Sequence, residues 1–500
     1  MEMKRVVIIG GGITGLAAAH RLLERSHESR KQVDLTVLEA GGRIGGIVQT
    51  SERDGFLLES GPDSFISEKP AALALVKRLG LESHLIETNP HHRRSFIVRQ
   101  GRLLPVPEGF HLLAPSRFWP FVKSDIFSWS GKARMALDLL LPRRELNGNN
   151  VGNNVEESLA EFVRRRLGTE ALERMAQPMV GGIYTADPER LSLQATMPRF
   201  LEMEREHRSL IRALRKQNSR RVSEDAGSET SGARYSLFLS FDRGMQVLTD
   251  TLEERISSFG SQIPTGADSG QTAIRVNTAV ESIAMEDGVS DGERSPKWKL
   301  ITSGNETLSA DAICLALPAY VSSRLLSTVD PQLAAALTEI SYASSATINL
   351  GFKRDDIPHP LDGFGFVVPF IEKRSLIACT FSSVKFAGRA PQGHALLRAF
   401  VGGALQPELL ELNGDELLAR VLGDLRDLLG IERAPLFTEV TKWERSMPQY
   451  HVGHLERVKR IEARLAALPG LVLAGNAYSG LGIPDCIRSG EAAADSIDED

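Results

Sequence analysis

Three consecutive glycines, Gly10 to Gly12, interrupt the apolar run that begins at Val6. The interruption argues against a secretory signal, whose apolar core is a continuous helix behind a basic start. It is typical of a buried strand that turns sharply into a helix, because glycine permits the turn and lets backbone N–H groups approach a ligand. Apolar residues recur at helical spacing between 16 and 23. This segment therefore reads as strand, glycine turn and helix.

The turn has the spacing Gly10-x-Gly12-x-x-Gly15, and a second alternating strand, 33–38, ends at Glu39. A carboxylate at that point is placed to accept hydrogen bonds from an adenosine ribose, while the start of the helix faces a pyrophosphate. A lone GxGxxG is a weak signal. Its combination with both strands and the acid predicts a Rossmann-like dinucleotide site.

Composition narrows the function. A chain of 500 residues predicts two or three domains, and a net charge of −5 argues against nucleic acid as a partner. The cysteines, Cys314, Cys379 and Cys486, lie far apart without CxxC pairing, so we expect neither disulfides nor a metal site. No apolar run approaches the roughly 20 residues that span a bilayer, and we expect a cytoplasmic protein.

The segment EAGGRIGG, which ends at Gly46, resembles the second FAD motif of flavoproteins of the amine oxidase and protoporphyrinogen oxidase superfamily. The resemblance implies that Arg43 and Gly46 lie near the pyrophosphate. It also implies that FLLESGPDSF reaches the flavin end of FAD at Gly61 and Pro62.

The last segment of the motif set is LVLAGNAYSGLGIPDCIRSGEAA. It predicts a buried strand, a glycine loop that contains Gly475 and Gly482, and a helix that starts at Ile483 and Pro484. The N-terminus of such a helix suits the negative charge of a reduced flavin. The resemblance further assigns Val280 and Trp443 to the cofactor site.

Four longer segments are more specific than FAD binding requires: FLLESGPDSFISEKPAALALVKRLGL, PMVGGIYTADPERLSLQATMPRF, WERSMPQYHVGH and GNAYSGLGIPDCIRSGEAA. With them the chain resembles, almost end to end, the oxygen-dependent protoporphyrinogen oxidases, including the bacterial coproporphyrinogen III oxidases. The family implies non-covalent FAD and a six-electron oxidation of a porphyrinogen in haem biosynthesis, with O2 as acceptor and H2O2 as product. Coproporphyrinogen III is slightly favoured over protoporphyrinogen IX.

Such chemistry needs little from side chains, because the flavin itself accepts the hydride. We therefore assign no catalytic acid or base. Gly181 and Gly182 match the family's active-site segment and are expected to face the macrocycle, although ordinary turn glycines explain them equally well. Arg94 is the predicted partner of a substrate carboxylate, and the strands around Ile348, Phe366 and Val367 are predicted to wall the slot.

The predicted fold class is α/β, with a discontinuous Rossmann-like FAD domain, an inserted mixed antiparallel sheet that binds substrate, and a helical subdomain. The FAD domain is assigned to 1–86, 235–320 and 437–500, and the substrate sheet to 87–114 and 321–436. The helical subdomain takes 115–233, with a disordered polar loop at 216–234.

Aromatic residues and cations alternate between 118 and 134, a pattern that either packs internally or rests on a membrane surface. Predicted partners are the porphyrinogen and O2, with the membrane surface and the next enzyme of the haem pathway as transient contacts, in a monomer or a homodimer. Two alternatives stay open. One is another FAD enzyme, an amine oxidase or a carotenoid desaturase, and the other is a flavin-binding haem-assembly protein without turnover.

Overall fold

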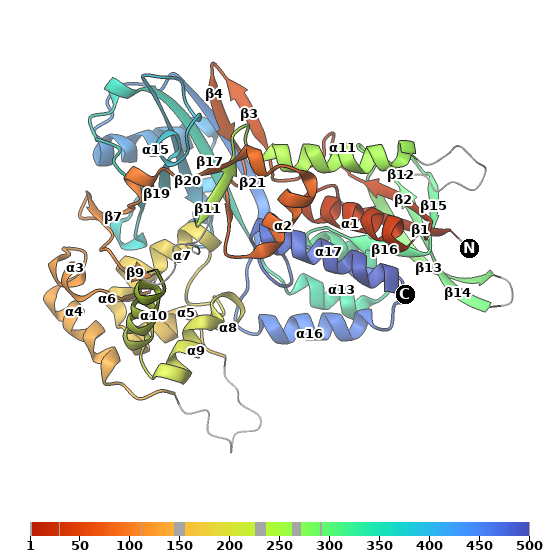
Figure 1. Cartoon of the computed structure of the whole chain (residues 1–500), viewed down its shortest axis with the longest axis horizontal. Coiled ribbons are helices and arrows are strands. Elements are labelled where there is room, and N and C mark those ends of the chain that lie inside the picture. Colours follow the sequence, from red (N-terminus) through yellow and green to blue (C-terminus); the bar gives the residue numbers. More distant parts are fainter. Residues whose placement is uncertain are drawn as a thin grey trace.

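A computed structural model describes residues 3–29, 31–111, 113–144, 156–225, 237–262, 272–290 and 293–499. Figure 1 shows three parts: a parallel sheet between helices near both termini, a second sheet backed by α15, and a group of helices below that second sheet. These parts confirm the predicted α/β fold with an inserted sheet and a helical subdomain.

The parallel sheet has five strands, in the order β12 (Thr272–Arg275), β2 (Val33–Leu38), β1 (Lys4–Ile9), β16 (Ala312–Leu315) and β22 (Leu471–Leu473). Ile9 pairs with both Leu38 and Leu315, so the central strands end level with one another. Ligands bind beyond the carboxyl ends of such strands. The site is therefore expected where β1 meets the glycine turn.

Helices cover both faces of this sheet, because its strands are apolar on both sides. One face packs on α1 (Ile13–Ser29), α2 (Pro70–Leu79), α11 (Gln246–Gln262) and α17 (Ile483–Glu499). The other packs on α12 (Ala319–Leu326), α13 (Pro331–Thr338) and α16 (His454–Leu465). Antiparallel strands extend this half: β13 (Val280–Ser290), β14 (Glu293–Thr302), β15 (Thr307–Ala310), β3 (Thr50–Arg53), β4 (Phe56–Glu59), β5 (Phe65–Ile66), β6 (Leu85–Glu87) and β11 (Phe238–Phe241).

The second sheet has seven strands, in the order β21 (Phe437–Pro448), β17 (Tyr342–Lys353), β20 (His394–Gly402), β19 (Leu376–Phe381), β18 (Gly365–Val367), β7 (Phe96–Arg99) and β8 (Arg102–Pro105). Its neighbours are antiparallel except β18 and β7. One face buries an apolar core against α15 (Gly414–Leu429). That helix starts where the Asn413 side chain accepts the Glu416 N–H and ends at Gly430, which has φ +72°.

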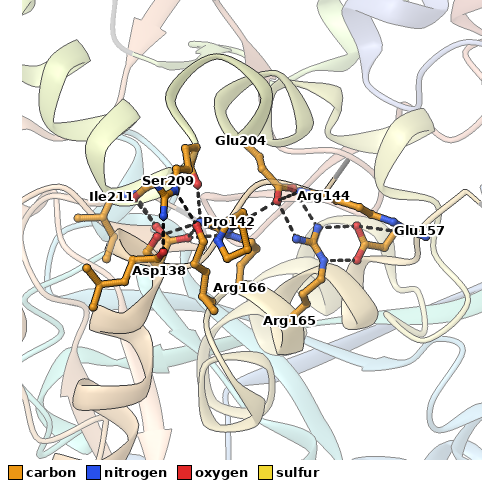
Figure 2. A network of polar contacts seen from close by, with 12 residues as sticks. Asp138, Pro142, Arg144, Glu157, Arg165, Arg166, Glu204, Ser209 and Ile211 are labelled. Atoms are coloured by element: carbon orange, nitrogen blue, oxygen red, sulfur yellow. Dashed lines mark hydrogen bonds and ion pairs between the residues drawn. The ribbon is translucent and has the colours of Figure 1, made fainter. Parts of the chain in front are cut away.

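The helical part contains α3 (Phe118–Lys123), α4 (Trp129–Ala136), α5 (Leu159–Arg166), α6 (Thr169–Ala171), α7 (Gln177–Tyr184), α8 (Leu193–Thr196), α9 (Pro198–His207) and α10 (Leu210–Asp225). A π-helical turn, Leu172–Ala176, leads directly into α7. Ser158 and Glu161 form a capping box at the start of α5. Figure 2 shows that Arg165 and Arg166 of α5 contact Glu204 of α9 and, through Asp138, Ser209 at the start of α10.

Three of the expected boundaries differ from the structure. Strand β21 pairs with β17 in the second sheet, so the last segment of the first domain begins at α16, after 448, rather than at 437. Helices α12 and α13 pack on the parallel sheet, so the middle segment extends past 320. Helix α10 continues to Asp225, so 216–225 is helical and not a loop, because a polar segment rich in Arg, Lys and Gln extends a helix anchored by buried Leu210 and Leu214. Residues 226–234 of the expected loop lie outside the described residues.

Candidate functional site

The first glycine turn joins the end of β1 to the start of α1. A Cβ atom at Gly10 would lie 2.4 Å from the Ala316 carbonyl oxygen, and one at Gly15 would lie 1.9 Å from the Gly10 carbonyl oxygen. Gly12 differs, because nothing lies within 4 Å of the place its Cβ would take. The first N–H groups of α1 have no acceptor within the helix. The turn is thus packed tightly below and open above, where an anionic group fits.

Glu39 ends β2 beside this turn. Its Oε2 accepts the Gly11 N–H at 2.8 Å, and its Oε1 accepts the Gly41 N–H at 2.7 Å. The Thr278 N–H donates to the Glu39 carbonyl oxygen at 2.8 Å, which places Val280, the first residue of β13, two residues from the contact. Each carboxylate oxygen keeps a lone pair that can accept a ribose hydroxyl. The structure therefore brings Glu39 and the Val280 segment together.

The second glycine loop lies against the first. Gly45 donates its N–H to the Gly11 carbonyl oxygen at 2.8 Å. Arg43 lies beneath the loop and donates to the carbonyl oxygens of Ile44 at 2.7 Å and Gly46 at 2.6 Å. In this structure the Arg43 guanidinium thus holds the loop in shape.

The segment 59–62, which contains Gly61 and Pro62, packs against the residues that follow the second glycine loop, and we call it the cofactor wall. A Cβ at Gly61 would lie 1.7 Å from the Ile47 carbonyl oxygen, so only glycine allows this approach. The preceding carbonyl, that of Ser60, accepts hydrogen bonds from Trp443 Nε1 at 2.9 Å and Thr347 Oγ1 at 2.7 Å. Trp443 therefore meets the cofactor wall through Ser60.

Two donors to this wall, Thr347 and Arg398, were missed by sequence reasoning. Arg398 donates to the carbonyl oxygens of Ser60, at 3.3 Å, and Gly61. A signal was present for Arg398, because it is a lone charge in the apolar strand ALLRAFVGG. The partner segment lies more than 300 positions away, and strand register is not readable from the pattern alone.

The loop from Gly475 to Gly482 is held by the segment that follows β21. The Tyr450 hydroxyl donates to the Asn476 carbonyl oxygen and accepts the Gly480 N–H, both at 2.7 Å. His454 stacks on Tyr450, with ring centroids 3.8 Å apart, and its Nε2 lies 3.0 Å from the Tyr478 carbonyl oxygen. Both residues come from QYHVGH, so this motif clamps the glycine loop.

Helix α17 starts at Ile483, with Pro484 in its first turn, as expected. The electrostatics of this helix start differ from those of a helix N-terminus that has no charged side chains nearby. Asp485 accepts the Gly482 N–H at 3.3 Å and pairs with Lys69 Nζ at 2.5 Å. The helix end therefore carries its own carboxylate, neutralised by a lysine from the start of α2, because a first-turn aspartate caps the helix better than solvent does.

Gly181 and Gly182 lie on α7, which packs on the second sheet. The Cβ positions at Gly181 and Gly182 are 3.7 Å from Ile377 Cγ2 and 3.6 Å from Val367 Cγ1. A cavity of about 20 Å³ separates α7 from the sheet, and it meets a second cavity of about 470 Å³ at Gly403 and Ala404. Trp443 lines the larger cavity. Trp443 thus faces this cavity and donates to the Ser60 carbonyl oxygen.

The remaining substrate predictions fare differently. Val367 faces α7, whereas Ile348 and Phe366 are buried in the core on the α15 side, so they cannot wall a slot against α7. The reason is the alternation of side chains along a strand, whose phase the sequence did not settle. Arg94 pairs with Asp362, stacks on Phe96 at 5.6 Å, and lines neither of the two cavities.

The described residues contain no disulfide, no metal-binding cluster and no helix that could cross a membrane. All three cysteines are buried and free, and burial raises the pKa of the Cys314 and Cys486 thiols to about 12. No cluster of His, Cys, Asp or Glu within the described ranges can hold a metal ion. No described helix is both long and apolar enough to cross a bilayer. A groove of about 1500 Å³ runs along β22 between α16 and α17, from the start of the parallel strands at Lys4 and Val33 to Tyr478 in the Gly475–Gly482 loop.

The residues present fit a dinucleotide. Gly12 and Gly475, whose Cβ positions are clear, and Glu39, whose carboxylate keeps lone pairs, line the cofactor cradle that we infer. Glu39 would hold the ribose, the 10–15 turn the pyrophosphate, and the 61–62 and 475–484 segments the ring. A Rossmann-like sheet with two such loops and an inserted sheet over the ring end defines a flavin-dependent oxidoreductase with FAD as cofactor.

Comparison with known proteins agrees. Residues 13–498 match the family of flavin containing amine oxidoreductases, and the chain belongs to this family. It is 35% identical to the coproporphyrinogen III oxidase of Bacillus subtilis (strain 168), over 98% of this chain and 97% of that protein. It is 30% identical to the chloroplastic protoporphyrinogen oxidase 1 of Spinacia oleracea, over 98% and 84%. A solved structure from Exiguobacterium sp. 255-15, assigned as a protoporphyrinogen oxidase, superposes with a TM-score of 0.81 at 32% identity and covers 100% of this chain and 99% of that one.

Proposed function

We propose that this protein is a coproporphyrinogen III oxidase of haem biosynthesis. Its substrate would lose six hydrogens as three hydride and proton pairs, while three O2 are reduced to three H2O2. The observation that carries the proposal is that the 60–61 end of the cofactor cradle is hydrogen-bonded to the second sheet, whose Val367 and Ile377 face α7. The near full-length similarity to a coproporphyrinogen III oxidase supports the choice of substrate.

The chain's own residues would act by position. When bound, FAD supplies the group that accepts hydride from a meso carbon. Val367 and Ile377 offer an apolar surface to a flat macrocycle, and the missing side chains of Gly181 and Gly182 let α7 lie close over it. The gap of about 20 Å³ has room for little more than one water, so α7 would move to admit substrate. The π-helical turn 172–176 precedes α7, Pro178 lies in the first turn of α7, and together they would supply the hinge.

Arg94 stays our predicted carboxylate partner, and Asp362 would then have to yield its place to a substrate propionate. No side-chain acid or base is needed, since protons from pyrrole nitrogens can pass to carbonyls or water. The amine oxidase alternative is less favoured, because the two tyrosines near the C-terminal glycine loop, Tyr450 and Tyr478, are buried, and the Tyr450 ring stacks on His454 instead of facing a substrate.

The test is the initial rate of porphyrin fluorescence in air, with purified yellow protein and coproporphyrinogen III or protoporphyrinogen IX in parallel. We expect a several-fold preference for coproporphyrinogen III over background. The reverse preference would assign the protein to protoporphyrinogen IX. Background rates with both substrates, despite bound FAD, would overturn the porphyrinogen proposal.

We also propose that the protein rests on a membrane surface through α3 and α4. Phe118 and Trp119 on α3, Trp129 on α4, and Leu137 and Leu140 just after α4 are exposed apolar residues, and Trp129 is 73% exposed. The exposed Arg117 and Lys123 flank them and suit anionic lipid headgroups. Cosedimentation with vesicles of phosphatidylglycerol and phosphatidylcholine should retain the protein, and the double variant Trp119→Gln, Trp129→Gln should release it. Equal retention of both would contradict this contact.

A further inference from the structure

The second sheet turns a polar row toward the cofactor wall. Along β17 and β20, Ile348 and Ala399 face the α15 core. The residues that alternate with them along each strand face the opposite side of the sheet. Asn349 and Arg398 are direct partners in the register of these strands. The side chains of Asn349 and Arg398 are buried, at 1% and 4% exposed.

This row holds three successive carbonyl groups of the cofactor wall. Asn349 Nδ2 donates to the Glu59 carbonyl oxygen at 3.1 Å. Arg398 donates to the carbonyl oxygens of Ser60 and Gly61. The Ser60–Gly61 backbone is therefore fixed from the sheet side, because each of its carbonyl oxygens has a side-chain donor.

The guanidinium of Arg398 is not fully satisfied. Its Nε is buried without a hydrogen-bond partner among the described residues, and so is Oδ1 of the neighbouring Asn349. Burial lowers the pKa of Arg398, although the charges of Asp63 and Glu59 oppose this. A buried group that served stability alone would be expected to have all its donors paired.

The acidic side chains around Arg398 lie closer to other bases than to Arg398 itself. Lys385 binds Asp63 at 2.8 Å, and Arg389 lies 3.9 Å from Glu59 while donating to Ser240 Oγ at 2.8 Å. Both acids thus have another base closer than Arg398, and a third acid, Glu439 on the strand beside Asn349, accepts a hydrogen bond from Ser60 Oγ at 3.3 Å. The guanidinium of Arg398 itself contacts backbone carbonyls and no carboxylate, so its charge lies directly beside the Ser60–Gly61 segment.

We propose that Arg398 is a positioning residue of the FAD site: it pins the Ser60 and Gly61 carbonyls to the sheet and leaves a buried positive charge beside the ring end of the cradle. That charge favours the reduced, negatively charged cofactor over the oxidised one. The inference rests on the FAD site and not on the choice of porphyrinogen, so the two can fail separately.

The test uses the holoenzyme and no porphyrinogen. Arg398→Met removes charge and donors, whereas Arg398→Lys keeps the charge but cannot reach both carbonyls in one plane. We expect Arg398→Met to lower the flavin midpoint potential and to weaken sulfite binding, which also creates negative charge on the flavin, by about tenfold or more. Arg398→Lys should keep most of the sulfite affinity but release FAD faster.

Arg389→Lys is the matched control, because Arg389 lies in the same buried cluster but contacts Ser240 and the Phe241 carbonyl instead of the 60–61 segment. It should lose stability while its midpoint potential stays that of the parent. If Arg398→Met fails to fold, Asn349→Leu tests the same row and should speed FAD release. Parental potential, sulfite affinity and FAD release in the Arg398 variants, or equal shifts in the Arg389 control, would overturn the proposal.

Discussion

Two buried clusters of charged residues differ in how completely their polar atoms are hydrogen-bonded. In the helical subdomain, Arg165 makes paired hydrogen bonds with Glu157 and Glu204, and Arg166 binds Asp138 (Figure 2). Arg166 and Asp138 are completely buried, and no side-chain atom of these five residues is without a partner. Beside the cofactor wall, Arg398 binds carbonyl groups instead of a carboxylate, and Arg398 and Asn349 each leave an atom unpaired. A saturated cluster holds helices together, whereas an unsaturated one still has interactions to offer a ligand.

Titration behaviour separates the clusters further. Burial alone would lower the pKa of Arg165, yet its hydrogen bonds with Glu157 and Glu204 outweigh burial and raise it. Burial raises the pKa of Glu59 to about 7, against the hydrogen bond from the Met245 N–H. Arg165 and Glu204, whose pKa is lowered by Arg165, therefore stay charged at physiological pH, whereas Glu59 changes its charge there.

The largest effect is expected from breaking the saturated cluster. Arg166→Met leaves Asp138 buried without its charge partner and should cost about 3–5 kcal/mol in the free energy of unfolding. Urea denaturation followed by circular dichroism measures it. Arg164→Ala is the control on the same helix, since its pair with Glu189 is exposed and should be worth less than about 1 kcal/mol. Equal losses in the two variants would remove the distinction between saturated and surface pairs.

The pH dependence of the unsaturated cluster comes next. The folded-state pKa of Glu59 lies above its ordinary value of 4.5, so its contribution to stability is full below that value and is lost as pH rises through about 7. Glu59→Gln should remove about 2–3 kcal/mol of the fall in unfolding free energy between pH 5 and pH 8. Asp63→Asn tests the opposite sign. Burial would raise the pKa of Asp63, but Lys385 and Arg398 hold it below its usual range, so its stabilisation disappears as pH falls.

A smaller and more selective effect, on activity rather than on stability, is expected at α7, where the helical subdomain packs on the second sheet. Gly182→Val would push a branched side chain toward Val367, which lies 3.6 Å from the Cβ position. We expect kcat/KM for coproporphyrinogen III to fall about tenfold with unchanged FAD content. Gly423→Val, in α15 where the Cβ position is clear, should leave kcat/KM unaltered. A loss of FAD in Gly182→Val would assign α7 to the cofactor instead.

The cofactor cradle was predictable because its signals are local: Gly10 to Gly15, Glu39 and the start of α17 are each set by a turn, a strand end or a cap. Interactions between distant segments were not. The contact of Arg398 with Gly61 depends on which face of β20 points inward, and the pairing of β21 with β17 depends on register. Arg94 was chosen from its place in the sequence, which does not reveal the competing carboxylate of Asp362.

The most direct test of the account is anaerobic mixing of the yellow holoenzyme with coproporphyrinogen III, followed by admission of air with porphyrin and O2 measured together. The account predicts bleaching of the flavin absorbance without O2, and then turnover that consumes three O2 for each porphyrin formed. An unbleached flavin, or porphyrin formation no faster than in the enzyme-free control, would contradict it.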